Sequence, residues 1–485
     1  MSALDPKTVS KGAYVGGKWV HASDGRTFDV TDPATGETIA VLPDCTAQDT
    51  ARAIENAHET FQQWRKVSPK ERARILRRWA DLMTAHQDEL GALLAREQGK
   101  PLAEAKGEIA YGASFVEWFA EEGRRVYGDV IPSPLPGREV LALKEPIGVA
   151  AAITPWNFPN AMITRKVGPA LAVGCTSVVK PAAETPLSAL AIAVLASEAG
   201  LPPGALNVVT SDRAQEVGEM LTSHPLVRKV SFTGSTEVGR IIMRQSSETI
   251  KKVSLELGGN APFIVFDDAD LDAAVQGALA SKYRNTGQTC VCANRFYVQA
   301  AVYDAFAEKL AAAVKQFKVG PAFEPGVTQG PLINQDALDK VEALVKDAET
   351  KGARALTGGR RHTLGGTFYE PTILTNVARE SRLLNEEIFG PVAPLVKFET
   401  DEEAIALANA SEYGLAAYFY ARDLGRVWRV LHALETGIVG VNEGIISMAE
   451  APFGGVKQSG LGREGSKYGV DEYVEIKYVC LGGLG

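Results

Sequence analysis

The residues with the clearest chemical potential lie in the stretch Arg284-Asn-Thr-Gly-Gln-Thr-Cys290-Val-Cys292. A thiolate is a strong nucleophile, and backbone amides at a helix end can face a sulfur there and lower its pKa. We therefore predict that Cys290 is a nucleophile. The Cys-x-Cys spacing could also ligate a metal, but no histidine or second cysteine pair lies nearby in the sequence, so no metal site is expected.

Two other segments offer groups that a thiol nucleophile needs in order to attack a carbonyl carbon. Asn157 follows a strand-like run, and its side-chain amide can stabilise a developing oxyanion. Glu256 ends another such run between apolar neighbours, where burial would raise its pKa toward the range of a general base. Alone, Asn157 could be a helix cap and Glu256 could pair with a lysine. Together with Cys290 they indicate acyl-transfer chemistry.

Two glycine-rich segments differ in their sequence context. Phe232-Thr-Gly234-Ser235-Thr-Glu-Val-Gly239 follows a predicted strand and opens a helix, so its amides suit an anionic group such as a pyrophosphate. A tight packing turn is the alternative. The segment 460–465 matches G-x-G-x-x-G but does not join a strand to a helix, so we predict a loop there.

Strand-like and helical runs alternate from residue 147 onward, which predicts parallel sheets with right-handed crossovers. The fold class expected is α/β, with two doubly wound parallel-sheet domains. The first unit has predicted strands at 149–154, 176–180, 205–209, 229–232 and 252–255, with helices at 160–173, 186–199, 214–223 and 236–247. The second has strands at 261–266, 295–298, 371–374, 393–398 and 437–441, with helices from 271 and 303. Helices are also predicted at 46–66, 69–98 and 103–125.

Two further strands lie outside these domains, at 140–143 and 474–480. The second alternates in character from residue to residue, as a half-buried strand does. Each needs a partner edge, which either its own domain or another subunit could provide.

Composition excludes several classes of protein. The 485 residues hold 51 Lys and Arg against 59 Asp and Glu, and a net charge of −8 lacks the basic footprint of a nucleic-acid binder. No apolar run is long enough to span a bilayer, and no signal or transit peptide is visible. Five cysteines in a chain of this length do not form a disulfide framework. We expect a cytoplasmic protein with reduced thiols and no membrane or nucleic-acid partner.

The motifs PWNFP, FTGSTEVG, LELGG, GQTC, EEIFGP and PFGGVKQSGLGREG occur in the order typical of the aldehyde dehydrogenase superfamily. The chain resembles that superfamily over about residues 12–480. Shorter sequence segments, including Val-Asn-Glu-Gly-Ile-Ile-Ser447, resemble the branch of the superfamily that oxidises succinate semialdehyde. The resemblance implies NAD(P)-dependent oxidation of succinate semialdehyde to succinate, with glutarate semialdehyde as the main competing substrate. The presence of Glu256 argues against CoA-acylating oxidation, and the presence of Cys290, Asn157 and Glu256 together argues against a non-catalytic homologue.

The resemblance also implies roles for single residues. Cys290 attacks the aldehyde, Asn157 and the Cys290 amide form the oxyanion hole, and Glu256 activates the hydrolytic water. The cofactor-binding set that it implies is Lys180 and Glu387 at the two riboses, Ser235 at the pyrophosphate and Phe389 near the nicotinamide ribose, with Gly234 and Trp156 as further cofactor-binding residues. Ala183 stands where NAD-preferring relatives often carry a glutamate, so NADP is expected to be preferred and NAD possible. Glu184, one residue displaced, could still take over that role.

Arg165, Arg284 and Ser447 match positions that hold the distal carboxylate in this branch, although two surface salt bridges are the alternative for the arginines. Cys292 is expected either to pack or to form a strained redox disulfide with Cys290. The implied organisation is a dinucleotide-binding domain (1–127 and 147–258), a catalytic thiol domain (259–458) and an oligomerisation element (128–146 and 459–485). The last suggests a homo-oligomer, a dimer of dimers.

Overall fold

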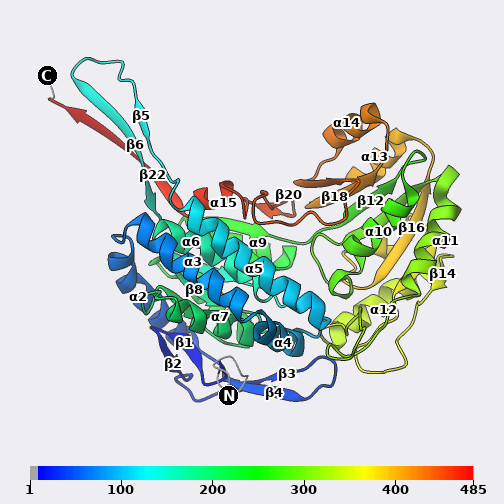
Figure 1. Cartoon of the computed structure of the whole chain (residues 1–485), viewed down its shortest axis with the longest axis horizontal. Helices are drawn as coiled ribbons and strands as arrows, with labels where there is room; N and C mark the ends of the chain where they lie inside the picture. Colours follow the sequence, from blue (N-terminus) through cyan, green and yellow to red (C-terminus); the bar gives the residue numbers. More distant parts are fainter. Residues whose placement is uncertain (1–8, 484–485) are drawn as a thin grey trace.

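The computed structural model describes residues 9–483 as two α/β domains and a projecting antiparallel arm (Figure 1). The fold class predicted from the sequence is confirmed. Strand and helix positions also agree with the alternation from residue 147, within one or two residues at most ends.

The first domain is built on an eight-stranded sheet whose central strands are parallel. The order is β2 (Lys18–Val20), β1 (Ala13–Val15), β9 (Leu206–Val208), β8 (Thr176–Lys180), β7 (Val149–Ile153), β10 (Val227–Thr233), β11 (Lys252–Glu256) and β21 (Gly460–Leu461). The chain moves from β7 outward to β9, then returns to the other side of β7, which is doubly wound topology. Strand β8, with the sequence Thr-Ser-Val-Val-Lys, is buried at every position, as parallel strands covered on both faces are.

Helices cover this sheet, and several of them begin or end at residues that cap a helix. Helix α2 starts after Thr46, which forms a capping box with Asp49, and α6 ends at Gly174, whose φ of 101° is left-handed. The helices are α2 (Ala47–Trp64), α3 (Pro69–Ala85), α4 (Gln87–Gln98), α5 (Leu102–Glu122), α6 (Ala161–Val173), α7 (Leu187–Glu198), α8 (Ala214–Ser223) and α9 (Thr236–Ser247). Strands β3 (Thr27–Thr31) and β4 (Thr38–Pro43) form a separate hairpin.

One helix prediction in this domain is wrong. The apolar spacing suggested a single helix over 69–98, but His86 has φ −103° and ψ 22°, which ends α3 and starts α4. The break redirects the chain so that α3 and α4 each pack against α5 and α7. Periodicity continues across such a break, so it does not reveal the change in direction.

The second domain has a seven-stranded sheet that is parallel except at one edge. Its order is β14 (Arg354–Thr357), β15 (Thr372–Thr375), β16 (Val392–Phe398), β13 (Ala293–Gln299), β12 (Ala261–Val265), β18 (Ala416–Tyr420) and β19 (Ile438–Val441). Its helices are α10 (Leu271–Lys282), α11 (Tyr303–Val314), α12 (Gln335–Thr350), α13 (Asp401–Asn409) and α14 (Leu424–Ala433), with short 3-10 turns η1 (Arg284–Gly287), η2 (Ala300–Val302) and η3 (Arg382–Leu384). The sequence analysis did not predict β14, β18, α12, α13 or α14.

The arm is a three-stranded sheet of β5 (Asp129–Ile131), β6 (Arg138–Pro146) and β22 (Val474–Gly482), seen in Figure 1 as cyan and red strands side by side. Strand β22 runs antiparallel to β6, from Val474 opposite Pro146 to Gly482 opposite Arg138. Within the described chain each of these strands finds a partner edge in its own subunit. Pairing across subunits, which the family resemblance implies, stays a prediction. The short strands β17 (Tyr413–Gly414) and β20 (Val456–Lys457) pair with each other, and α15 (Tyr468–Asp471) precedes β22.

Within residues 9–483 no helix combines the length and apolar character needed to cross a membrane. The same residues hold no cluster of three or more His, Cys, Asp or Glu side chains that could bind a metal ion.

Candidate active site

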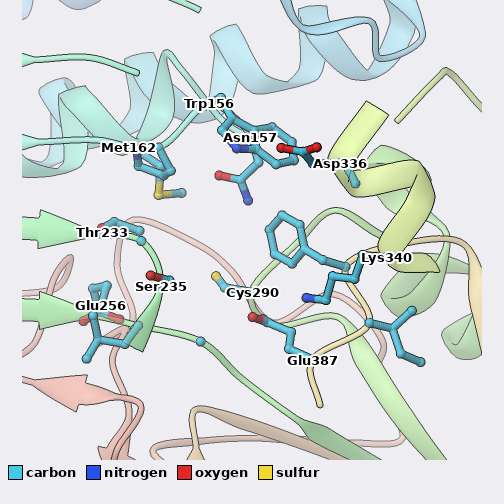
Figure 2. Close-up of a pocket in the computed structure, with 17 residues that line it drawn as sticks. Trp156, Asn157, Met162, Thr233, Ser235, Glu256, Cys290, Asp336, Lys340 and Glu387 are labelled. Carbon is cyan, nitrogen blue, oxygen red and sulfur yellow. The ribbon is translucent and has the colours of Figure 1, made fainter. Parts of the chain in front are cut away.

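A cavity of about 350 Å³ lies between the two domains and gathers most of the residues singled out from the sequence (Figure 2). Cys290 projects into its middle, with Asn157 on one side and Glu256 and Glu387 on others. Asn157 and Glu256 lie at the carboxyl ends of β7 and β11, where parallel sheets bind ligands, Cys290 lies in the loop before β13, and Glu387 lies between η3 and β16. The lining residues are Pro155, Trp156, Asn157, Met162, Thr233, Gly234, Ser235, Glu256, Leu257, Gly258, Cys290, Asp336, Ala337, Lys340, Glu387, Ile388 and Phe389.

The loop that presents Cys290 has an unusual backbone. Asn285 and Thr286 have φ values of 52° and 56°, and Gly287 follows with 76°. Left-handed conformations cost non-glycine residues of order 1–3 kcal/mol each and persist where surrounding contacts impose them. Here the Asn285 amide donates to Glu104 Oε2 at 2.7 Å, and its side-chain amide donates to the carbonyl of Asn157 at 3.0 Å. The thiol loop is thus tied directly to the loop that carries Asn157.

Asn157 is fixed through both its backbone and its side chain. Its carbonyl accepts from Lys100 Nζ at 2.8 Å as well as from Asn285. Its Nδ2 donates to the carbonyl of Gln288 at 3.0 Å. A carboxamide nitrogen carries two hydrogens, so one N–H remains to face an oxyanion in the cavity.

Glu256 is buried, and neither of its carboxylate oxygens has a hydrogen-bond partner among the described residues. Burial raises its pKa well above the usual value, and the nearby Glu464 carboxylate raises it further. The predicted direction of this pKa shift is confirmed. A carboxylate with a raised pKa and free lone pairs is chemically suited to accept a proton from water.

The predicted direction for the Cys290 pKa is wrong. Burial raises the pKa of the thiol to about 12, and Glu387 and Glu256 raise it too, while Arg165 and Arg284 act against them. The sequence indicated the helix-end amides, but it could not show two carboxylates and a largely apolar cavity around the sulfur. In this structure the thiol is protonated at neutral pH.

A buried ionic cluster missed by the sequence analysis lies behind Glu256. Glu464 accepts from Lys166 Nζ and lies 2.5 Å from Arg165 Nε, and these three side chains are almost fully buried. Its two cationic neighbours outweigh the effect of burial and lower its pKa. Adjacent Arg and Lys in an otherwise apolar helix were the available signal, since buried cations require a carboxylate. Glu464 belongs to the segment predicted to be a loop, in which Gly460–Leu461 instead pairs with β11 as β21.

The three residues expected at a distal carboxylate have different surroundings. Arg165 is committed to Glu464 through Nε, and its guanidinium lies 4.1 Å from the Phe453 ring centroid. Arg284 and Ser447 line one small cavity beside Val291 and Tyr418. Within residues 9–483, Arg284 forms no ion pair, and its guanidinium lies 5.1 Å from the ring centroid of Phe158. It is a half-buried cation with no carboxylate partner.

The pyrophosphate and nicotinamide positions predicted from the sequence lie on the main cavity. Ser235 is the N-cap of α9 and accepts from the Val238 amide at 3.3 Å, so this helix start is open to an anion. A Cβ at Gly234 would lie 2.4 Å from the Phe232 ring, which explains the glycine. Trp156 and Phe389 meet edge to face at 5.5 Å. These features fit a dinucleotide.

Glu387 is the other carboxylate in this cavity. Its Oε1 accepts from the Gly259 amide at 3.1 Å, and burial raises its pKa to about 7. The other oxygen faces the cavity space and is available to a hydroxyl.

Lys180, Ala183 and Glu184 do not line the main cavity. Lys180 ends β8 and donates to the Pro181 carbonyl at 3.2 Å, and burial lowers its pKa while Glu184 opposes that shift. Ala183 and Glu184 are half-buried in the turn that follows, and Glu184 forms no ion pair with the residues described. A cationic amine beside this turn suits a phosphate or hydroxyl.

Cys292 lies in a turn, since its amide donates to the Thr289 carbonyl at 2.9 Å. Its thiol is buried and donates to the Lys282 carbonyl at 3.2 Å. Both Cys290 and Cys292 are free thiols. The segment between the two cysteines is therefore bent and not extended.

The chain belongs to the aldehyde dehydrogenase family, whose pattern matches residues 19–479. It is similar to a glutarate-semialdehyde dehydrogenase of Pseudomonas aeruginosa, with 60% identity over all of both chains. An NADP(+) succinate-semialdehyde dehydrogenase of Escherichia coli is 59% identical, over 99% of this chain and 100% of the relative. A crystal structure of succinate-semialdehyde dehydrogenase from Burkholderia pseudomallei superimposes with a TM-score of 0.96 at 62% identity, over 97% of each chain.

Proposed function

We propose that the protein oxidises succinate semialdehyde to succinate with reduction of NADP. The observation that carries this proposal is the unpaired Arg284 in a pocket shared with Ser447, on the same loop as the thiol. A half-buried guanidinium without a carboxylate is a site for the carboxylate of a ligand. An aldehyde that bears a distal carboxylate satisfies both the thiol and the arginine.

The chemistry follows from the groups around Cys290. Glu256, which lines the same cavity, first takes the proton of the Cys290 thiol and passes it to water. The thiolate attacks the aldehyde carbon, and the resulting oxyanion accepts from the free N–H of Asn157 and the Cys290 amide. The bound nicotinamide supplies the hydride acceptor. The acyl group then remains on Cys290 as a thioester. Glu256 takes a proton from water, whose oxygen attacks the thioester, releases succinate and restores the thiol. Since Glu256 supplies a base for hydrolysis, transfer of the acyl group to CoA is disfavoured.

For the cofactor, we propose that Gly234 and Ser235 hold the pyrophosphate, Glu387 and Lys180 the ribose hydroxyls, and Trp156 and Phe389 the nicotinamide end. Ala183 offers no carboxylate to repel a 2′-phosphate, and Lys180 can attract one. The Escherichia coli relative is named for NADP(+), which supports this choice. A preference for NAD above about tenfold, or roughly 1.4 kcal/mol, would assign the opposing role to Glu184.

Glutarate semialdehyde is the second candidate substrate, because a relative at 60% identity carries that name. Both aldehydes present the same two groups and differ by one methylene, which is worth about 1–3 kcal/mol of discrimination. Steady-state kinetics with the C4 and C5 semialdehydes, each against NADP and NAD, would rank them.

We also propose that residues 1–127 and 147–258 bind the dinucleotide, that residues 259–458 carry the thiol, and that the segments 128–146 and 459–485 mediate assembly into a dimer of dimers. The outer edge of β22 pairs with no described strand, which supports assembly through that edge. The oligomeric mass in solution tests this.

The test of the substrate uses Arg284→Gln with succinate semialdehyde and with butanal, which has the same chain length and no carboxylate. Loss of a buried charged contact should cost about 2–5 kcal/mol in kcat/KM on the semialdehyde and much less on butanal. Arg74→Gln, at an exposed residue of α3, is the control. Equal losses on both aldehydes would contradict the proposal.

A further inference from the structure

We propose that Tyr111 is a specificity-determining residue whose hydroxyl donates a hydrogen bond to the distal carboxylate of the substrate, beside Arg284 and Ser447. The inference rests on the proposed function and adds a contact that the sequence motifs did not indicate.

Helix α5 places Tyr111 against the segment that follows the oxyanion residue. Its ring meets Phe115 edge to face at 4.8 Å and packs against Phe158 and Met162. Met162 lines the main cavity, and Phe158 supports the Arg284 guanidinium. The tyrosine is therefore held between the thiol cavity and the arginine by contacts of its ring alone.

The hydroxyl of Tyr111 is buried and has no hydrogen-bond partner among the described residues. Arg165 and Ser447 lie close to it and Arg284 acts on it electrostatically, but none of these contacts has the geometry of a hydrogen bond. A buried hydroxyl without a partner costs about 1–3 kcal/mol, and a ligand atom that accepts from it would remove that cost.

The neighbouring groups share one property, which is that they donate. Arg165 Nη1 is also buried without a partner, because Glu464 engages the guanidinium through Nε. Arg284 has no ion pair among residues 9–483, and Ser447 can donate from its hydroxyl. Burial raises the pKa of Tyr111, so its hydroxyl keeps its proton at neutral pH. Around Tyr111 only the two hydroxyl oxygens can accept, so the groups there offer more N–H and O–H donors than acceptors, and an acceptor-only carboxylate would receive the remainder.

The experiment compares Tyr111→Phe with the wild-type holoenzyme. Phenylalanine keeps the ring and its packing and removes only the hydroxyl. We expect kcat/KM for succinate semialdehyde to fall roughly 10- to 100-fold, mostly through KM, because hydrogen bonds to charged groups are worth that much. The value for butanal should change by less than about threefold, and the dissociation constant of succinate, measured by calorimetry, should rise by the same factor as KM.

Tyr369→Phe is the matched control, since the Tyr369 hydroxyl is equally buried and unpartnered but lies in the core of the second domain. It should leave both aldehydes and succinate binding unchanged. Equal losses on both aldehydes in Tyr111→Phe, or unaltered succinate binding, would overturn the role of Tyr111 while the wild-type preference for the semialdehyde stands. A wild-type enzyme that oxidises butanal as efficiently as the semialdehyde would overturn the proposed function, and the carboxylate contact with it.

Discussion

Removing the Lys100 amine should destabilise the protein far more than removing a lysine from its surface. Lys100 Nζ donates to Glu108 Oε2 at 2.6 Å, and both side chains are 1% exposed. The amine also donates to the Asn157 carbonyl and lies 3.9 Å from the Phe158 ring centroid. Lys100→Met keeps the chain length but leaves the Glu108 carboxylate buried without its cation.

Breaking one partner of a buried ion pair costs about 3–5 kcal/mol. Glu108 Oε1 also accepts from the amides of Asn160 and Ala161, so an acceptor is still needed there. The double variant Lys100→Met with Glu108→Gln keeps that acceptor and removes the charge. It should recover about 2–3 kcal/mol of the loss, since a neutral amide is far cheaper to bury than a lone carboxylate. The control is Lys106→Met, whose exposed pair with Asp88 is worth about 0–1 kcal/mol.

The assay is urea unfolding of the three variants, with free energies compared at equal m-values. Activity provides a second readout, because Lys100 orients the carbonyl of Asn157. Loosening the oxyanion residue should lower kcat about tenfold or more for charged and uncharged aldehydes alike. If Lys100→Met were no less stable than Lys106→Met, or if the double variant were no more stable than Lys100→Met, the pair would not be coupled as described.

Three further outcomes follow from the thiols and from a second buried carboxylate. Inactivation of the cofactor-free enzyme by iodoacetamide should accelerate about tenfold per pH unit from pH 7 to 10, because the Cys290 pKa is raised to about 12; a plateau below pH 9 would contradict this. Burial raises the pKa of Glu97 to about 8, so the folded chain holds a proton that the unfolded chain releases. The stability that this proton contributes is fully present below about pH 4.5 and is lost as the pH rises through 8. Glu97→Gln should therefore flatten the pH dependence of the urea midpoint, and an unchanged slope would contradict the raised pKa of Glu97. After mild peroxide, dithiothreitol should restore activity faster in wild type than in Cys292→Ala, because Cys292 captures the oxidised Cys290; identical recovery would make Cys292 a packing residue only.

Local patterns predicted most of the parallel strands in the two large sheets, although β18 was missed. Runs such as Thr176–Lys180 are apolar enough to be buried strands, and the alternation with helices leaves few topologies. The catalytic trio could be proposed because each member ends a strand or follows a helix, and such ends meet at one edge.

The predictions that the structure contradicts depend on contacts between segments far apart in the chain. The direction of the Cys290 pKa shift depends on Glu256 and Glu387, which lie 34 and 97 positions away in the sequence numbering. Glu464 could not be placed behind Glu256 from the sequence, because its segment shows no strand or helix periodicity. The pairing of β21 with β11, which holds the segment there, is visible only in the structure. The break at His86 has the same origin, since the packing of α3 and α4 on α5 and α7 determines it.

One face of α5 carries Glu104, Glu108 and Tyr111, spaced four and three residues apart, so they lie in line along the helix. The first reaches the thiol loop, the second the start of α6, and the third the proposed carboxylate site. For redesign of selectivity, Glu104 and Glu108 are thus the positions to keep, and Tyr111 is the position to vary. Saturation of residue 111, with the two glutamates untouched, would sample aldehydes with other distal groups while the geometry of the thiol and the oxyanion amide is inherited unchanged.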